Sequence, residues 1–274
     1  MPELAEVEFF RRVWMRAATV PVLEVQLHSK ARPLREVDHE ALLQGLTCSV
    51  LESSSASGKR MCFKFSGNQW LGVHLGMTGE LRVEASDFTP LKHDHLVLRM
   101  AKASLIFSDP RMFGRIQYAS GADAPPWWRD LPPDLLSPKF NEAWVNDFLL
   151  RHQGLPLKAA LLLQDGFAGV GNWMADEILW RAHLHPQRKV GTLTAAEMAT
   201  IHAEIVAVAR EALRTVVVEE GATFAEPPQG WLFHTRWGKV GLCPRDGLKL
   251  RRETVGGRTT AWCDACQPMK NKRE

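Results

Sequence analysis

The spacing of apolar residues changes twice along the chain, and these changes restrict the fold more than any other feature of the sequence. Between residues 22 and 120, apolar and polar residues alternate in short segments separated by Ser, Gly, Asp and Pro, as in an antiparallel sandwich or barrel. Between residues 140 and 219 the apolar spacing is helical, and residues 231–274 return to short strands and turns. The sequence therefore predicts an α+β protein built from several parts.

The expected elements of the first half follow from this pattern. Residues 3–18 should form a helix, because apolar residues recur at helical spacing from Val7 to Ala17. Residues 121–138 are rich in Pro and should form a linker. Examples of the short strands expected between about 22 and 120 are Val22–Leu27, Arg60–Phe65, Trp70–Leu75, Leu96–Met100 and Ser104–Phe107.

Helices are expected in the second half. The segments with helical spacing are 144–149, 156–164 and 173–182. Thr194 and Glu197 form a capping box, since each side chain can accept a hydrogen bond from the backbone N–H of the other residue. A long helix should follow this box and end before Gly221.

The composition excludes several classes of protein. Charged residues are 24% and apolar residues 45% of the chain, an ordinary balance for a folded globular protein. No run of about 18 uncharged apolar residues occurs, so no membrane-spanning segment is expected. The acidic start lacks the apolar region of a secretory signal. Five cysteines, an odd number, favour a reducing compartment, and we expect a cytoplasmic protein.

Charge is distributed unevenly. Residues 231–274 hold 10 Lys and Arg against 4 Asp and Glu, a local charge of +6, whereas the rest of the chain carries −3. A basic block on a near-neutral body favours a polyanionic partner, and a solvated tail is the alternative.

The first candidate site is the Pro2-Glu3 pair. Removal of Met1 would leave Pro2 with a free secondary amine, and an α-amino group is partly neutral at pH 7. A neutral amine can attack an aldehyde-like sugar carbon, and Glu3 could then act as a general acid or base. The structural alternative is a helix start, with Pro2 in the first helical position and acidic residues behind it.

A second group of motifs could act on a base. His74-Leu-Gly-Met77-Thr-Gly79 and Asp109-Pro-Arg111-Met-Phe113-Gly114 would supply an apolar wedge, a cation and an aromatic plate, which can unstack a base and fill its gap. Alternatively, Met77 and Phe113 are core residues. Lys92-His93-Asp94-His95 could also suggest a metal, although nothing in the sequence completes such a site.

Two further motifs lie in the second half. In Gly169-Val-Gly171-Asn172, a helix N-terminus could bind a phosphate through backbone N–H groups, although Gly-x-Gly alone is a weak signal. Near the C-terminus, the spacing of four residues suggests zinc with an Asp in place of one Cys. These are Cys243, Asp246, Cys263 and Cys266. A hairpin that packs without metal is the alternative, and its tip would carry Arg258 to a phosphate.

Together, and in this order, these segments resemble the formamidopyrimidine-DNA glycosylase / endonuclease VIII family of DNA repair enzymes over nearly the whole chain. Leu4 favours the formamidopyrimidine branch. The resemblance implies a helix and β-sandwich catalytic domain, a helical domain with a helix–two-turn–helix (H2TH) motif, and a zinc-finger-like β-hairpin. We expect these domains to span 1–125, 126–232 and 233–274.

The resemblance also implies residue roles. Pro2 would attack C1′ of the damaged nucleotide, and Glu3 would assist as acid and base. Lys59 would donate a proton in β-elimination, and Arg258 would bind phosphate and assist δ-elimination. The residues expected to contact DNA are Met77, His93, Arg111, Phe113, Lys158 and Asn172.

The implied activity is that of a bifunctional DNA glycosylase / AP lyase in base excision repair. A monomer would bind damaged double-stranded DNA, remove an oxidised base (formamidopyrimidine, 8-oxoguanine or an oxidised pyrimidine) through a Pro2 Schiff base, and nick the strand without an organic cofactor. Glu6 and Glu177 match acids that shape the active site. Two other classes stay open: a lesion-binding protein that does not cut, and a zinc-ribbon regulator.

Several positions depart from the family pattern. Ala5 replaces a usual Pro, and Met112 replaces a common Arg. Gln153 stands where a DNA-contacting Lys is usual, with Lys158 close by. The segment Gly221–Gly230 is shorter than the loop that covers a flipped 8-oxoguanine, so formamidopyrimidines and oxidised pyrimidines become candidate lesions.

Overall fold

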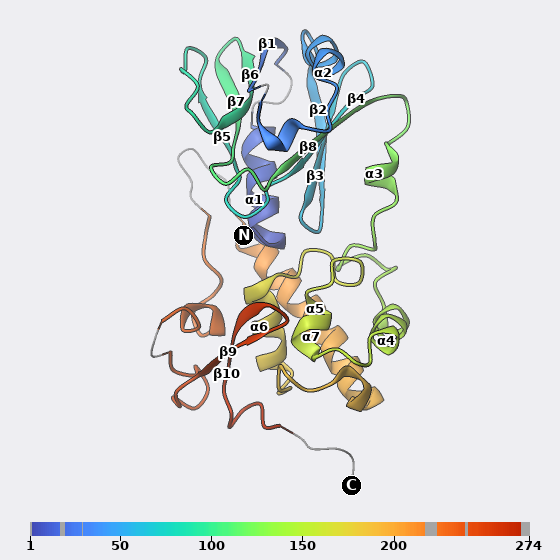
Figure 1. Cartoon of the computed structure of the whole chain (residues 1–274), viewed down its shortest axis with the longest axis vertical. Helices are drawn as coiled ribbons and strands as arrows, with labels where there is room; N and C mark the ends of the chain where they lie inside the picture. The colour runs from blue at the N-terminus through green and yellow to red at the C-terminus, as the bar shows by residue number, and fades with distance from the viewer. Residues whose placement is uncertain (1, 17–19, 29, 217–223, 239–240, 270–274) are drawn as a thin grey trace. The chain divides into compact units, whose positions relative to one another are not determined.

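The chain divides into two compact units (Figure 1). The computed structural model describes residues 2–16, 20–28, 30–216, 224–238 and 241–269. Unit 1 comprises Met1–Leu131 with Val216–Phe224, and unit 2 comprises Pro132–Thr215 with Ala225–Glu274. Strands fill most of unit 1 and helices dominate unit 2, so the expected α+β class is confirmed. The three-domain division stays a prediction.

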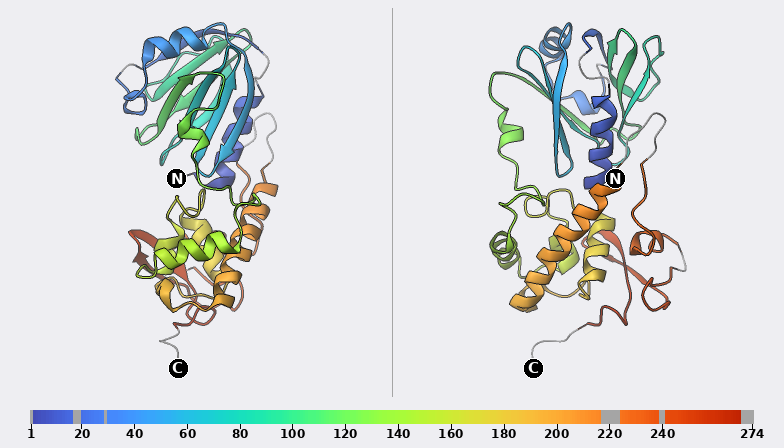
Figure 2. Two further views of the ribbon diagram at one scale, coloured as in Figure 1. Left: turned by 90° about the vertical axis from the view of Figure 1, so that its right-hand side faces the viewer. Right: turned by 180° about the vertical axis from the view of Figure 1, so that it is seen from behind.

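Unit 1 contains a sandwich of two four-stranded antiparallel sheets (Figure 2). One sheet, in the order β1-β6-β7-β5, consists of Val22–Leu27, Asp94–Met100, Ala103–Ser108 and Glu80–Ala85. The other, in the order β2-β3-β4-β8, consists of Leu51–Ser57, Arg60–Phe65, Gln69–His74 and Arg115–Ser120. Buried side chains from both sheets, including Phe63, Phe65 and Phe107, form one apolar core.

Helix α1 (Leu4–Met15) packs against β2 and β5 and so contacts both sheets. Its Trp14 is fully buried, with its ring centroid 4.9 Å from that of Phe63. The prediction of a helix over residues 3–18 is confirmed up to the end of α1, and residues 17 and 18 lie outside the described residues.

The described part of unit 1 also contains three short helices. They are η1 (Arg32–Leu34), α2 (His39–Leu46) and α3 (Pro126–Arg129). Helix α3 lies within the expected linker and packs on the sandwich, because a Cβ atom at Gly72 of β4 would lie 2.8 Å from the Trp127 ring.

The expected strands were found close to their predicted bounds. β1 and β3 match them, β6 begins two residues earlier, and β4 and β7 each differ by one residue at both ends. Strand β2 lies within the predicted region of short strands but was not singled out, because its sequence Leu-Glu-Ser-Ser-Ser-Ala-Ser is half exposed and resembles a loop in composition. Strands β5 and β8 lie in the same region and were not singled out either.

Unit 2 contains α4 (Glu142–Arg151), α5 (Leu157–Leu161), α6 (Asn172–Arg181), η2 (Val190–Thr192), α7 (Ala195–Arg214) and η3 (Leu232–His234). The predicted capping box of Thr194 and Glu197 is confirmed at the start of α7. Helix α5 is shorter than the predicted 156–164, and in the loop that follows it the Gln164 side chain donates to the Val170 carbonyl at 2.9 Å.

Unit 2 ends in a β-hairpin of β9 (Arg251–Val255) and β10 (Arg258–Trp262). Val255 pairs with Arg258, so the turn has two residues, Gly256 and Gly257, with φ of 60° and 73°. A two-residue turn of this kind requires positive φ at both positions, which glycine adopts without strain. No helix among the described residues is long and apolar enough to cross a membrane.

Candidate functional site

Pro2 precedes the first turn of α1 and does not belong to it. The helix cap is Glu3, whose backbone N–H donates to the Glu6 carboxylate at 2.5 Å. Pro2 therefore does not occupy the first helical position that the helix-start explanation requires. The Glu3 residue is only 2% exposed, while Pro2 is half-buried. Met1, whose removal the amine chemistry requires, lies outside the described residues.

Lys59 lies at the tip of the β2–β3 hairpin. Ser57 pairs with Arg60, which leaves Gly58 and Lys59 as the two turn residues, and Gly58 has a φ of 57°. Lys59 is buried at this tip. The hairpin thus gives a rigid position to the lysine that the resemblance assigns to proton donation.

Buried Asp109 organises the loop that carries Arg111 and Phe113. Its Oδ2 accepts the Gly114 N–H at 2.7 Å, and its Oδ1 accepts the Thr78 hydroxyl at 2.8 Å. The loop and the turn at Met77 are also in direct contact, since a Cβ atom at Gly76 would lie 2.4 Å from the Phe113 carbonyl carbon.

This arrangement presents one aromatic ring to solvent. Phe113 is 47% exposed, and the Arg111 guanidinium carbon lies 4.9 Å from its ring centroid. Met77 is half-buried on the adjoining turn. The core-residue alternative thus does not describe Phe113, and the three side chains belong to two segments held together by Asp109.

The His-Asp-His segment is divided between core and surface. Asp94 forms a two-pronged ion pair with Arg82 Nη2, both contacts being 2.8 Å, and buried His95 contacts the Asp109 carbonyl through Nε2 at 2.9 Å. His93 is half-buried, and its Nδ1 has no hydrogen-bond partner. Within the described part of the chain, these residues do not form a metal-ligand group.

A basic pocket beside Phe113 was not anticipated. This cavity of about 260 Å³ is lined by four arginines together with His74 and Phe113. The arginines are Arg32, Arg35, Arg60 and Arg115. They are separated by up to 83 positions in sequence, and only the tertiary fold brings them together. The sequence signalled no more than that this part of the chain contains several arginines.

His74 is uncharged in this pocket. Burial lowers its pKa to about 4, and the nearby charges of Arg60 and Lys59 act in the same direction. Its Nδ1 accepts the Gly76 N–H at 3.0 Å, so in the neutral ring Nε2 carries the proton and can donate a hydrogen bond. The pocket therefore combines four cations with a neutral donor, and the Glu36 carboxylate pairs with two of these cations, Arg35 at 3.3 Å and Arg115.

Unit 2 brings Asn172 next to the β9–β10 hairpin. Asn172 Nδ2 donates to the Thr259 carbonyl at 2.9 Å, and the neighbouring Arg258 is exposed. Asn172 Oδ1 is buried without a hydrogen-bond partner. Two of the predicted phosphate contacts thus lie in one hydrogen-bonded group.

Lys158 requires a correction. It was expected to contact DNA, but it is fully buried, and its ammonium forms an ion pair with Asp176 at 2.5 Å. An ammonium in this position is not available to an external phosphate. Sequence position gave no indication of this, because a surface lysine and a buried ion-paired lysine look alike in sequence.

Glu177 is the other buried acid of α6. Burial raises the pKa of its carboxyl group, whereas its hydrogen bond from Arg181, at 2.9 Å, opposes that shift. The backbone of Leu232 and Phe233 also donates hydrogen bonds to it. Glu177 therefore ties α6 to η3.

The four predicted metal-ligand residues do come together. The ligand atoms of Cys243, Asp246, Cys263 and Cys266 all lie within 4.8 Å of one another. Cys243 Sγ and Cys266 Sγ are 3.8 Å apart, close to the separation that a tetrahedral metal with bonds of about 2.3 Å imposes on two thiolates. The Leu248 N–H bonds to Asp246 and lowers its pKa to about 2, so the carboxylate is ionised and can act as a ligand. The cluster could therefore bind a metal.

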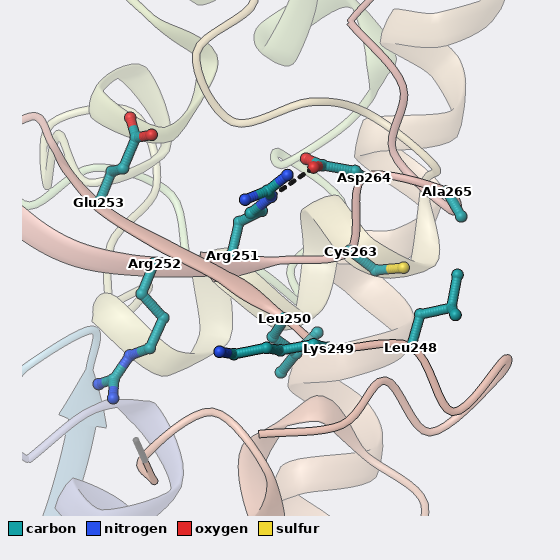
Figure 3. Close-up of a pocket in the computed structure, with 9 residues that line it drawn as sticks. All are labelled: Leu248, Lys249, Leu250, Arg251, Arg252, Glu253, Cys263, Asp264 and Ala265. Carbon is teal, nitrogen blue, oxygen red and sulfur yellow. Dashed lines mark hydrogen bonds and ion pairs between the residues drawn. The ribbon is translucent and has the colours of Figure 1, made fainter. Parts of the chain in front are cut away.

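A second cavity, of about 610 Å³, adjoins this cluster (Figure 3). It is lined by residues 248–253 and by Cys263 to Ala265, and two of the lining side chains, Arg251 and Asp264, form an ion pair at 2.6 Å. Most of the lining side chains in Figure 3 come from the hairpin strand and the cysteine loop, so the cavity belongs to the finger itself.

Comparisons with known proteins agree with this architecture. The Formamidopyrimidine-DNA glycosylase N-terminal domain matches residues 1–116, and the Formamidopyrimidine-DNA glycosylase H2TH domain matches residues 131–221. The formamidopyrimidine-DNA glycosylase of Thermus thermophilus is 35% identical over 284 residues, covering 97% of this chain and 98% of the relative. That of Nocardioides sp. is 33% identical over 294 residues, covering 100% and 96%.

Solved structures of the Lactococcus lactis formamidopyrimidine-DNA glycosylase are also similar. Its complex with DNA containing an oxidized pyrimidine has a TM-score of 0.86 at 27% identity, covering 98% of this chain and 100% of that one. Its complex with DNA containing an AP site has a TM-score of 0.83 at 27% identity, covering 97% and 100%. The resemblance seen in the sequence is confirmed over the full length, and the chain belongs to the formamidopyrimidine-DNA glycosylase family of enzymes.

Proposed function

We propose that this protein is a bifunctional DNA glycosylase / AP lyase that excises oxidised bases from duplex DNA in base excision repair. The position of Pro2 supports this most directly, since it lies ahead of the helix cap and next to the buried carboxylate of Glu3. A helix does not require a proline in the position before its cap. An N-terminal secondary amine that acts as a nucleophile does require one, placed next to a general acid.

The proposed reaction begins at the Pro2 nitrogen. Its lone pair forms a bond to C1′ of the damaged nucleotide, the base leaves with the electrons of the glycosidic bond, Glu3 assists its protonation, and the Pro2 nitrogen loses its own proton. The C1′–O4′ bond then breaks, O4′ takes up a proton with the help of Glu3, and the nitrogen lone pair forms the C1′=N iminium, which acidifies C2′. Loss of the C2′ proton breaks the C3′–O bond, with Lys59 supplying a proton to the leaving group, and loss of the C4′ proton, assisted by Arg258, breaks the C5′–O bond.

The surface of unit 1 supports a role in opening the duplex. The exposed ring of Phe113, with Arg111 beside it and Met77 on the adjoining turn, suits insertion between bases. The basic pocket around His74 would hold phosphates next to this wedge, and His93 and Asn172 would add further backbone contacts.

Zinc is the metal we propose for the Cys/Asp cluster. Three thiolates and one carboxylate suit its preference for sulfur ligands with tetrahedral geometry. Zinc would link the Cys243 loop to the end of β10 and stabilise the finger. No step of the proposed reaction uses it.

Formamidopyrimidines and oxidised pyrimidines are the lesions we favour, with 8-oxoguanine as a further candidate. The relatives are named for formamidopyrimidine, and one similar structure contains an oxidized pyrimidine. Part of the short segment Gly221–Gly230, residues 221–223, lies outside the described residues. We propose that the protein acts as a monomer on cellular DNA in the cytoplasm.

Borohydride trapping on a duplex with an abasic site tests the proposal. The native protein should form a covalent adduct and nick the strand, while Pro2→Gln and a form that retains Met1 should bind the duplex without forming an adduct. Binding without trapping by the native protein would overturn the enzymatic proposal and leave a lesion-binding protein. Binding that is indifferent to lesions, with metal present, would favour the zinc-ribbon regulator.

A further inference from the structure

Asp176 of α6 lies at the centre of a buried ionic cluster in unit 2 that the proposed reaction does not use. Its Oδ1 accepts from Lys158 Nζ at 2.5 Å, and its Oδ2 accepts from Arg236 Nη2 at 2.6 Å and from Nε at 3.0 Å. All three residues are buried. Because desolvation of buried ions offsets much of their attraction, such a cluster is weak evidence for stability alone.

The cluster has more positive than negative charge. Two cations share one carboxylate, which gives a formal charge of +1, and the adjacent Glu177 carboxylate is engaged by Arg181 at 2.9 Å. Backbone carbonyls accept further hydrogen bonds from the two cations. Lys158 Nζ donates to the Asn172 carbonyl at 2.5 Å, and Arg236 Nη2 lies 3.4 Å from the Thr259 carbonyl.

The same groups hold the hairpin that carries Arg258. Asp176 Oδ2 accepts the Ala261 N–H at 3.1 Å, so β10 is attached to α6 by a charged acceptor. On the other side of Arg258, a Cβ atom at Gly256 would lie 2.8 Å from Ala159 Cβ, so the turn is in close contact with α5. Arg258 therefore lies between two anchored positions, the contact of Gly256 with α5 and the bond of Ala261 to Asp176.

We propose that Asp176, together with Lys158 and Arg236, is a positioning residue that sets where Arg258 and Asn172 meet the DNA backbone. The inference rests on the proposed function of these two side chains. Asp176 orients the β10 backbone through Ala261, Arg236 and Asn172 both reach the Thr259 carbonyl, and Lys158 fixes the start of α6. The excess positive charge of the cluster favours an anion next to this group.

A charge-balanced double variant, Asp176→Asn with Arg236→Gln, tests this role. It removes one anion and one cation, so the formal charge stays +1. The readouts are the thermal midpoint, the salt dependence of binding to a duplex with a tetrahydrofuran abasic analogue, and the ratio of δ- to β-elimination products on abasic-site DNA.

We expect the salt slope of log Kd to fall by about one unit for each phosphate that the variant no longer neutralises. The 3′-phosphate product of δ-elimination should fall by about 10²-fold relative to the unsaturated aldehyde, because misplacement of an assisting group by about an ångström can cost that much. A residue that served stability alone would lower the thermal midpoint and leave both the slope and the product ratio at native values.

The matched control is Arg188→Gln with Glu197→Gln. This pair is also a partly buried, two-pronged ion pair of unit 2, with contacts of 2.6 and 2.8 Å, and Arg188 otherwise bonds to Thr192 of η2. Its slope and product ratio should stay native. If the first double variant does not fold, Arg236→Lys is the substitute. It keeps the charge but lacks the guanidinium group that reaches both Asp176 and Thr259, and it should lower the salt slope and the product ratio to a smaller degree.

Native slope and product ratio in a folded Asp176 or Arg236 variant would overturn the inference. Failure of the native protein to trap or nick would instead overturn the proposed function. The salt slope on the uncleavable duplex separates the two, because it tests positioning without requiring any bond to break.

Discussion

The hydroxyl of Thr78 donates a hydrogen bond to Oδ1 of Asp109 across 2.8 Å. Thr78 follows Met77 directly, and Asp109 begins the loop that carries Arg111 and Phe113. One bond to a buried carboxylate thus connects the two segments proposed to enter the duplex, and it is stronger than a bond between neutral groups because the acceptor is charged.

Replacing Asp109 should loosen this connection. Asp109→Asn removes the negative charge, so the bonds to the Gly114 N–H and to Thr78 lose their charge assistance, and with the amide oxygen on Gly114 the Thr78 hydroxyl must turn to accept from the amide nitrogen. We expect the free energy of unfolding in urea to fall by about 1–3 kcal/mol, and Thr78→Val, which removes a single bond, to cost about 1 kcal/mol. The rate of base excision from duplex DNA should fall by more than the loss of stability explains, because Met77, Arg111 and Phe113 are no longer held in fixed positions relative to one another. Equal stability of Asp109→Asn and the native protein would contradict the connection.

Sequence patterns predicted the sandwich, the capping box and the cysteine cluster, because each depends on local periodicity or short spacing. They did not single out β2, whose serines are half exposed, and they missed the basic pocket, whose arginines come from distant segments. They also misplaced Lys158. Whether a lysine is exposed or paired in the core depends on Asp176 of another helix, and no local pattern carries that information.

His74 should make stability depend on pH. Its pKa is about 4 in the folded protein, against an ordinary value of 6.5, so the folded state binds fewer protons than the unfolded state between these values. The stabilising contribution is complete above pH 6.5 and is lost as the pH falls towards 4. The size of this loss should be about 2–3 kcal/mol. His74→Gln keeps a polar side chain but does not titrate.

The measurement is the free energy of unfolding of both proteins between pH 7 and 4. The difference between native and His74→Gln should shrink steadily over this range as the pH falls. A constant difference would mean that His74 does not titrate as its burial implies.

The rate at which the metal cluster releases zinc should depend on its one carboxylate ligand, Asp246. Asp246→Cys supplies a fourth thiolate, and we expect zinc to leave about tenfold more slowly in the presence of a colorimetric chelator. Stripping zinc from the native protein should lower the thermal midpoint. Cys48→Ser, at a cysteine outside the cluster, is the control and should leave zinc content and release unchanged. A metal content near zero in freshly purified native protein would favour the metal-free hairpin.

Glu3 should matter more for removing a base than for cutting an abasic strand. The carboxylate is buried beside Pro2, where it can protonate a departing base or the opening sugar, whereas a preformed abasic site has no base to lose. Glu3→Gln keeps the size of the side chain and removes the proton transfer. We expect excision of a formamidopyrimidine to fall by about 10²–10⁴-fold, in the range of general acid–base catalysis, with a much smaller effect on borohydride trapping at an abasic site. Parallel single-turnover assays on the two duplexes measure this ratio, and equal losses in both would show that Glu3 serves the amine attack itself and not the departure of the base.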